Sequence, residues 1–553
     1  MARIIALAFV LLLALLSSCG KRKADVLYFN GTIYSGESSS SNLQAFAVRD
    51  GRIVSTGSDD DILDGFDAPK KVDLKGRTVL PGFIDAHCHF FGYASDLLKC
   101  DLTGSRSYEA ALELLNAFSK TNKFSWLLGR GWDQNDWEDH SFPTRERLDS
   151  LYPTVPVFLM RIDGHAALCN AVALQLAGIN GDTRVAGGEV LLNKSGEPTG
   201  LLIDNAVDLV KAKIPPFPDS LNAEALLKAQ QHCFSVGLTT VDDAGLGKDS
   251  IFLIDRLQQE GKLKLRVYAM ISDSKETRDY FFSKGPYKTD RLNVRAVKVY
   301  ADGALGSRGA CLKRPYADQP GHYGFLLHDL AYMNDIMDEA HENGFQVCTH
   351  AIGDSAVKTI LMLYRENLSG ENPRRWRIEH CQVVDPADMD YFSRYSIIPS
   401  VQPTHATSDM YWAEERLGKD RMTGAYAYRS LEREAETIAF GTDFPVERIN
   451  PLLTFYAAVS RKDLEGNPPD GFRAEEAMKR KDVLKAMTTW AAYANFEEEE
   501  KGLIDNGYFA DFIGAGDNDA HIRLLRIGPD CGHEPKEFLD VAVTQAYNTT
   551  DLV

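Results

Sequence analysis

The sequence lacks the excess of positive charge that nucleic-acid-binding proteins carry. It has 61 Lys and Arg residues against 79 Asp and Glu residues, which gives a formal net charge of −18. No run of basic residues is longer than Lys21-Arg22-Lys23, so no groove for a polyanion is indicated. We therefore expect no nucleic-acid partner, and we attribute the acidic total to solubility.

The sequence also lacks cysteine pairs of the CxxC type, although it has nine cysteines. A chain of 553 residues buries enough surface to fold without disulfides. Cys88, Cys348 and Cys381 lie in apolar, strand-like segments, and we expect them to be small buried residues. Pairing among the other cysteines stays open at this level.

The N-terminal apolar run, from Ile4 to Leu16, is shorter than the roughly 20 residues of a membrane-spanning helix. Its length is typical of a signal-peptide core. The sequence Leu16-Ser17-Ser18-Cys19 resembles a bacterial lipobox, which implies that residues 1–18 are removed and that Cys19 is acylated. We expect a lipoprotein of the bacterial cell envelope, anchored in the lipid membrane, and Gly20 favours the outer membrane, facing the periplasm. An ordinary cleaved secretory signal is the alternative.

Residues 24–80 alternate apolar and polar positions between turn signals, which is typical of β-strands. Asn30-Gly31 and Asp50-Gly51 are hairpin turn sequences. The segment from Gly502 to Ile513 is strand-like as well. We therefore expect residues 24–80 and 495–553 to build one small β-sandwich module from both ends of the chain.

From residue 81 the pattern changes to strand, loop and helix. Eight short apolar runs are typical of strands, and several are spaced about 30 residues apart, the size of one βα unit. Eight such units close a barrel, so we predict an α/β fold with a (β/α)8 TIM barrel over residues 81–494. The expected strand centres lie near Ile84, Thr240, Tyr268, Lys298, His350, His380, Gln402 and Thr442.

One interval breaks this spacing, because the first two strands lie about 150 residues apart. We predict a large insertion after strand one, over about residues 100–220. The active sites of this barrel are built from loops at the strand C-termini. The insertion, which contains Gly129 to Asp133 and Asp163-Gly164-His165, is therefore expected to cover or line the pocket.

Metal-binding residue types occur at the ends of the predicted strands. Two histidines at positions i and i+2 of a strand point to the same face, so His87 and His89 can bind one metal. Imidazole and carboxylate groups are the ligands of hydrolytic Zn²⁺, Mn²⁺ or Fe²⁺ centres. The predicted set is His87, His89, Lys298, His350, His380 and Asp443.

Several of these segments resemble the amidohydrolase superfamily, in its amidohydrolase-3, YtcJ-like branch. The resemblance covers nearly all of residues 26–515 and implies a metal-dependent hydrolase. The segments that carry it are Pro81 to His89, Val297 to Arg308, His350 to Asp354, Gly441 to Pro445 and Gly502 to Asp511.

The resemblance implies a pair of divalent metal ions. By this resemblance His87, His89 and Asp443 hold the more buried ion, and His350 and His380 hold the second. Zn is favoured over Mn or Fe, but the identity of the metal stays open because metal availability also sets occupancy.

The resemblance further implies that Lys298 is carboxylated and bridges the two ions. A protonated lysine would repel a cation, whereas reaction with CO₂ makes an anionic group with two oxygens. The implied nucleophile is a metal-bound hydroxide that attacks a carbonyl. Asp443 would shuttle its proton to the leaving nitrogen. An ordinary structural role for Lys298 is the alternative.

Candidate substrate contacts lie in the insertion and after strand four. They are Trp132, His165, Asp302 and Arg308, and a structural or surface role is the alternative for each. Gly303, Gly306 and Gly309 are interpreted as turn glycines, because no P-loop lysine accompanies them.

The first functional hypothesis is a metal-dependent amidohydrolase that acts on non-peptide carbon–nitrogen bonds of a small-molecule substrate. The second is a related hydrolase of cyclic amides, esters or amidines. The third is a catalytically inactive, lipid-anchored binding protein, against which stands the complete metal-binding set. A homodimer is consistent with the family resemblance.

Overall fold

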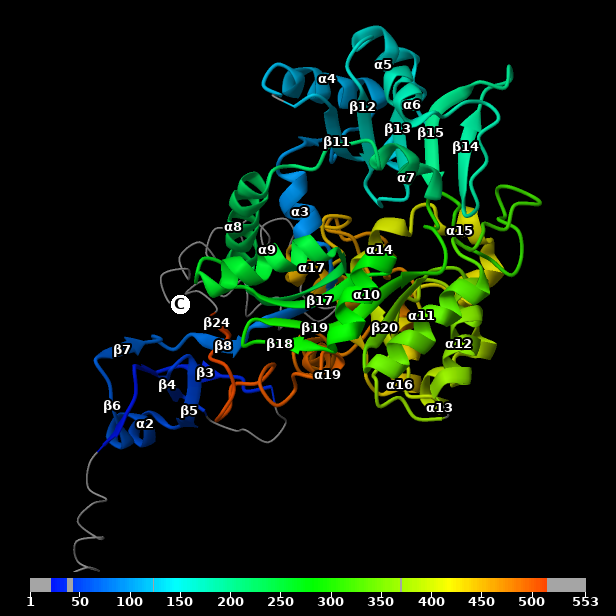
Figure 1. Cartoon of the computed structure of the whole chain (residues 1–553). Coiled ribbons are helices and arrows are strands. Elements are labelled where there is room, and N and C mark those ends of the chain that lie inside the picture. Colours follow the sequence, from blue (N-terminus) through cyan, green and yellow to red (C-terminus); the bar gives the residue numbers. More distant parts are fainter. Residues whose placement is uncertain (1–20, 37–42, 123, 369, 515–553) are drawn as a thin grey trace, which may run out of the picture. The chain divides into compact units, whose positions relative to one another are not determined.

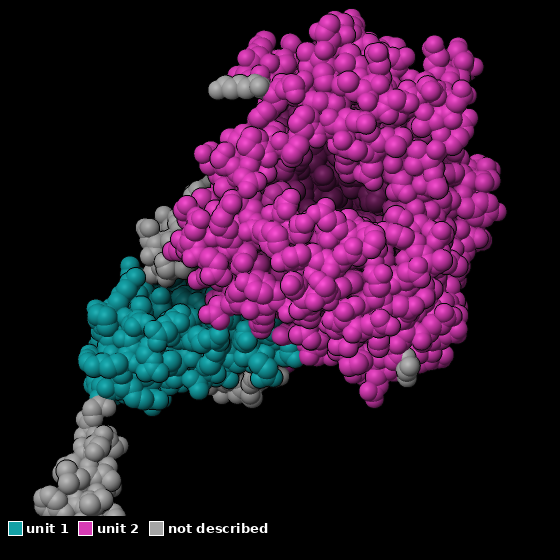
Figure 2. All heavy atoms as spheres, viewed as in Figure 1, with its two compact units in different colours: residues 1–82, 497–526 teal, residues 83–496, 527–553 magenta. Residues whose placement is uncertain are grey.

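The computed structural model describes residues 21–36, 43–122, 124–368 and 370–514. The chain divides into two compact units, coloured separately in Figure 2. Of the described residues, unit 1 contains those from 21 to 82 and from 497 to 514, and unit 2 contains those from 83 to 496. The predicted signal peptide and Cys19 lie outside the described residues, as does the C-terminal segment from residue 515.

Unit 2 is built on a barrel of eight parallel strands (Figure 1). The strands pair in the order β9, β16, β17, β19, β20, β21, β22, β23. Backbone hydrogen bonds of 2.8 Å from Asp443 N to His87 O and from His89 N to Phe444 O connect the last segment to the first. The strands are Phe83–Cys88 (β9), Leu238–Leu246 (β16), Arg266–Ser272 (β17), Leu292–Tyr300 (β19), Gln346–Ala351 (β20), Arg377–His380 (β21), Ile398–Val401 (β22) and Ala439–Phe440 (β23).

The predicted TIM barrel is therefore confirmed. Every expected strand centre lies in a barrel strand or within two residues of one. The strands are nearly continuous apolar runs because parallel strands with helices outside are buried on both faces. Helices between or after the strands include Asp219–Ser235 (α8), Lys248–Gln259 (α9), Lys275–Lys284 (α10), Leu330–Asn343 (α11), Asp354–Leu368 (α12), Asp390–Arg394 (α13), Tyr428–Ala435 (α16) and Pro451–Ser460 (α17).

The helix α11 shows how local sequence sets these boundaries. Its N-cap is Asp329, whose side chain accepts a hydrogen bond from the Tyr332 amide, as a good N-cap residue does. Its C-cap is Gly344, which adopts a left-handed conformation with φ of 80°. Glycine takes this conformation without a Cβ clash, so the chain turns there and enters β20.

The segment between β9 and β16 forms a separate mixed sheet, as Figure 1 shows for β11 to β15. Its strand order is β10-β11-β12-β13-β15-β14. Leu127 and Leu159 face one apolar cluster, and their neighbours Leu128 and Phe158 face another, which is the two-residue alternation of a sheet covered on both sides. The strands are Cys100–Asp101 (β10), Leu127–Trp132 (β11), Val157–Arg161 (β12), Ala166–Cys169 (β13), Gly188–Leu192 (β14) and Pro198–Asp204 (β15).

Unit 1 contains short strands in small sheets. Asp50-Gly51 joins Ala45–Arg49 (β4) to Arg52–Gly57 (β5) as the expected hairpin. The hairpin expected at Asn30-Gly31 is wrong. The strand before it, β2 (Val26–Phe29), pairs with β4 and Lys70–Asp73 (β7), whereas β3 (Thr32–Ile33) pairs with Thr78–Pro81 (β8).

The N-terminal and C-terminal segments of unit 1 meet in one of these sheets, where Phe512–Gly514 (β24) pairs antiparallel with β8. Tyr28 and Phe46 of one sheet and Ile33 and Val79 of the other share one apolar cluster. The β-sandwich itself stays a prediction. Among the described residues, no helix is both long and apolar enough to cross a membrane.

Candidate metal centre

The six predicted ligands meet at the C-terminal ends of the barrel strands. His87 lies on β9, Lys298 on β19, His350 on β20 and His380 at the end of β21. The ring centroids of His87 and His380 are 4.8 Å apart, and those of His350 and His380 are 4.5 Å apart. Residues from position 87 to position 443 of the chain are thus gathered around one point of unit 2.

Asp443 lies between the first two histidines. Its Oδ1 is 3.2 Å from His89 Nε2 and 3.7 Å from His87 Nε2. The ligand atoms of these three residues all lie within 4.8 Å of one another. This arrangement suits a metal ion bound by two imidazoles and a carboxylate.

Each predicted histidine has one ring nitrogen engaged by a protein group. His87 Nδ1 lies 2.5 Å from Glu379 Oε2, and His89 Nδ1 lies 3.1 Å from Ala244 O. The corresponding contacts of the other two are His380 Nδ1 to Gln402 Oε1 at 2.8 Å and His350 Nε2 to Gly303 O at 3.4 Å. Such contacts fix the tautomer and orientation of metal-binding histidines and leave the opposite nitrogen for the metal.

A second group of potential ligands includes His405, which the sequence analysis missed. His405 lies on the short helix α14 (Pro403–Asp409) directly after β22. It forms a compact group with His380 and Asp443, and its Nε2 is 3.6 Å from Asp443 Oδ2. Its position in Gln402-Pro403-Thr404-His405, just past a predicted strand end, was the signal that could have identified it.

The donor set fits a cation. Asp443 Oδ1 is buried and accepts no hydrogen bond, and His405 Nε2 also has no hydrogen-bond partner in the described part of the chain. Burial raises the pKa of Asp443, but the neighbouring histidines His89 and His87 outweigh this effect and hold that pKa well below its usual range. Asp443 is therefore an ionised, buried carboxylate with an unused oxygen, which a divalent cation would satisfy.

Glu379 contacts His87 at the ring nitrogen Nδ1. Its Oε1 is 2.9 Å from Arg377 Nε, and Arg377 Nη1 is 3.2 Å from Asp242 Oδ2, with all these side chains fully buried. Burial raises the pKa of Glu379, but Arg377 and His87 together lower it to about 2. The carboxylate is therefore ionised and can accept the Nδ1 proton of His87, so that Nε2 faces the centre.

Lys298 is buried, with 1% of its surface exposed. Its Nζ lies 3.1 Å from His87 Nε2 and 5.0 Å from the Tyr300 ring centroid. No ion pair joins Lys298 to a carboxylate among the described residues. Burial therefore dominates and lowers the pKa of its amine.

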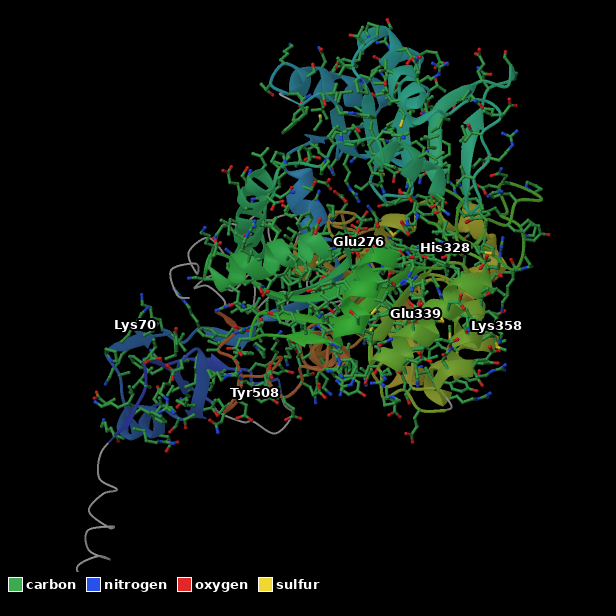
Figure 3. The ribbon with its side chains drawn as sticks, viewed as in Figure 1. Lys70, Glu276, His328, Glu339, Lys358 and Tyr508 are labelled. Carbon is green, nitrogen blue, oxygen red and sulfur yellow. The ribbon has the colours of Figure 1, made fainter. Side chains whose placement is uncertain are left out.

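A cavity of about 1360 Å³ adjoins these residues, and Figure 2 shows unit 2 hollowed on the face towards the viewer. His89, Lys298, His350, His380, His405 and Asp443 line it, together with His165 and Asp204 of the insertion. His328, labelled in Figure 3, belongs to the same wall. The volume accommodates a small molecule.

The four predicted substrate contacts have different surroundings in the structure. Only His165 lines the cavity. Trp132 is buried in an apolar cluster of the insertion, where its Nε1 donates to Leu159 O. Arg308 pairs with Asp318 at 2.7 Å.

Asp302 is fully buried, and its carboxylate accepts hydrogen bonds from the backbone amides of Cys311, Ile352 and Gly353. These contacts tie the loop after β19 to the loop after β20, beside His350. Asp302 does not line the cavity, so the geometry indicates a role in holding the loops. The barrel and its strand-end centre together define a metal-dependent hydrolase.

The chain belongs to the amidohydrolase family, whose model matches residues 70–521. It is 33% identical over 517 residues to the protein YtcJ of Bacillus subtilis (strain 168), covering 91% of this chain and 97% of YtcJ. It is 26% identical over 521 residues to an N-substituted formamide deformylase of Arthrobacter pascens, covering 88% and 93% of the two chains. The crystal structure of a metal-dependent hydrolase from Pyrococcus horikoshii OT3 is similar with a TM-score of 0.74 and 27% identity, covering 92% of this chain and 99% of that one.

The contact between Glu379 and His87 leads to a test. Replacing Glu379 by Gln removes the charge that holds the Nδ1 proton of His87, so we expect zinc affinity to fall by about 10-fold or more. Chelator competition measures the affinity. The exposed Glu366 on α12 supplies the matched control Glu366→Gln, which should retain wild-type affinity, and equal affinities for all three proteins would contradict this role of Glu379.

Proposed function

We propose that this protein hydrolyses a non-peptide carbon–nitrogen bond of a small molecule, such as an N-acyl or N-formyl amide. The observation that carries the proposal is the buried Asp443 carboxylate, placed among four histidines beside a large cavity. The name of the related N-substituted formamide deformylase from Arthrobacter pascens describes a reaction of this type. Hydrolysis of a cyclic amide, an ester or an amidine is an outcome that the substrate test below distinguishes.

The proposed centre holds two divalent ions, with Zn²⁺ favoured over Mn²⁺ or Fe²⁺. His87, His89 and Asp443 are the proposed ligands of one ion, and His350 and His380 of the other. Divalent cations bound there would supply Lewis acidity towards a carbonyl oxygen and would lower the pKa of a water molecule.

Lys298 is proposed to be carboxylated and to lie between the two ions. Carboxylation requires a neutral amine, and the burial of Lys298 favours this form. The added carboxylate would turn a repulsive side chain into an anionic one. It would also balance part of the positive charge of the centre.

Asp443 is the proposed proton carrier. It accepts the proton of the attacking water on its carboxylate and returns it to the nitrogen that leaves. His405 Nε2, 3.6 Å from Asp443 Oδ2, limits the positions that this carboxylate takes. Gln382 Nε2 lies 3.0 Å from His405 Nδ1, so Nε2 is the His405 nitrogen that faces Asp443.

Elemental analysis distinguishes the two possible sets of ligands for the second ion. We expect about two Zn per chain in the protein with residues 1–18 removed, as in other paired hydrolytic centres. We expect His350→Ala to retain about one, because the proposed second ion loses a ligand, and His405→Ala to retain both. Loss of an ion from His405→Ala alone would instead assign the second ion to His380, His405 and Asp443.

Replacing Asp443 by Asn tests the chemistry. The amide cannot carry the proton, so we expect turnover of the best amide substrate to fall by at least about 100-fold. The measurement is a rate on a panel of N-formyl and N-acyl amides, cyclic amides, esters and amidines, with zinc content determined in parallel. Turnover of esters or amidines alone would replace the proposed amide reaction, and zinc-loaded wild-type protein without turnover on any compound would favour a binding protein.

The cellular location is proposed from the sequence alone. We propose that the chain is a lipoprotein acylated at Cys19 and anchored in the outer membrane, facing the periplasm. Expressed in a bacterium with an outer membrane, the wild-type protein should fractionate with that membrane, and Cys19→Ser should lose the anchor because it lacks the acylated thiol. Identical fractionation of both proteins would argue for an unlipidated form.

A further inference from the structure

Two polar residues of the insertion, His165 and Asp204, are linked next to the metal centre. His165 directly precedes β13, and Asp204 ends β15, which pairs antiparallel with β13. The Asp204 amide donates to His165 O at 2.8 Å, and His165 Nδ1 lies 2.6 Å from Asp204 Oδ1. The pair is therefore joined through both backbone and side chains.

The surrounding chain is shaped around the Asp204 carboxylate. Asp204 has a positive φ of 48° with ψ of −124°, a conformation that non-glycine residues rarely adopt and that concentrates at functional sites. Its side chain is fully buried. A Cβ on Gly303, in the loop after β19, would lie 2.5 to 2.8 Å from the carboxylate atoms of Asp204, and a Cβ on Gly309 would lie 2.3 Å from Asp204 Oδ2. Glycine at these two positions leaves the space that the carboxylate occupies.

His165 is directed at the reaction site. Its ring centroid is 5.1 Å from that of His350, and it lines the same cavity as the metal-centre residues. Its side chain is 16% exposed, although it lies among buried groups. Because Nδ1 is engaged by Asp204, Nε2 is the nitrogen available to a ligand, and no hydrogen bond within the described part of the chain uses it.

The His165–Asp204 pair is not needed to attach the insertion to the barrel, because other contacts provide this attachment. Asn205 Nδ2 donates to Leu327 O, in the loop after β19, at 2.9 Å. Arg416 Nη2 donates to Asn135 Oδ1 at 3.2 Å. These bonds hold the insertion to the loops of the barrel without His165.

We propose that His165, oriented by Asp204, is a catalytic residue that hydrogen-bonds the amide group of the substrate through Nε2. The insertion then completes the active site in addition to enclosing it. This inference rests on the proposed amide hydrolysis and extends it, because it assigns the insertion a contact with the reacting group. Asp204 is the positioning residue of the pair.

The test compares zinc-loaded wild-type protein with His165→Phe, Asp204→Asn and a control, His140→Phe. His140 is an exposed histidine of the same insertion outside the cavity lining. We expect His165→Phe to lower kcat/KM for the best amide by about 100-fold, a typical effect for a lost catalytic side chain. We expect Asp204→Asn to lower it by about 10-fold, as for a lost orienting contact, and His140→Phe to leave it unchanged.

Two further measurements separate substrate contact from a structural role. Zinc content should stay at the wild-type value in all variants, and calorimetry should show weaker binding of a slowly hydrolysed N-alkyl formamide to His165→Phe. Gly309→Ala supplies a variant that displaces the Asp204 carboxylate without replacing either His165 or Asp204, and it should behave like Asp204→Asn. It decides the question where His165→Phe does not fold.

The outcomes are distinct. Unchanged kcat/KM and unchanged formamide affinity in His165→Phe would overturn the inference and leave the proposed amide hydrolysis intact. Loss of zinc from His165→Phe would overturn it as well, because His165 would then act through the metal centre. A zinc-loaded wild-type protein that neither hydrolyses nor binds any amide would refute the proposed function and the inference together.

Discussion

The metal centre depends on a charge placed inside the barrel, the guanidinium of Arg377. Arg377 is fully buried and pairs with Asp242 of β16 and with Glu379, which lies two residues further along β21. Glu379 in turn contacts His87 on β9 and so links the guanidinium to this histidine. A buried ion pair is costly unless every member has partners, and removing one member typically costs 3–5 kcal/mol, about as much as a large core truncation. The network therefore joins three barrel strands and fixes the orientation of one histidine that the cation needs.

The strand ends and the insertion contribute different things to the site. His87, Lys298, His350 and His380 sit on strands whose backbones are locked by parallel pairing, so their relative positions follow from the register of the barrel. The insertion has its own sheet and its own two apolar clusters, so it folds around cores of its own. Its strands place His165 beside the centre, where the proposed contact with substrate requires a side chain in a defined position.

The barrel, and the gathering of the six candidate ligands at one end of it, could be predicted because both follow from periodic features of the chain. Apolar runs at a βα spacing marked the eight strands, and metal-binding residue types at their ends marked the candidate ligands. The partners of those ligands could not be predicted in the same way. Arg377 and Glu379 are charged residues inside a strand, and their meaning appears only when the barrel brings Asp242 and His87 to them. His405 follows a strand by a few residues, but a single histidine carries no spacing signal. The Asn30-Gly31 turn failed because tertiary pairing sends β2 and β3 to different sheets, which local turn chemistry does not encode.

The same reasoning explains why the predicted substrate contacts separate as they do. We selected Trp132, Asp302 and Arg308 for their residue type and their neighbours in the sequence. In the structure, each of these side chains bonds to another group of the protein. His165 differs because it lines the cavity and because only its Nδ1, not its Nε2, has a hydrogen-bond partner among the described residues. Burying a strained, ionisable residue such as Asp204 next to two glycines adds nothing to packing that an apolar residue would not supply better. The energetic cost of burying Asp204 is explained by its role in orienting the His165 imidazole.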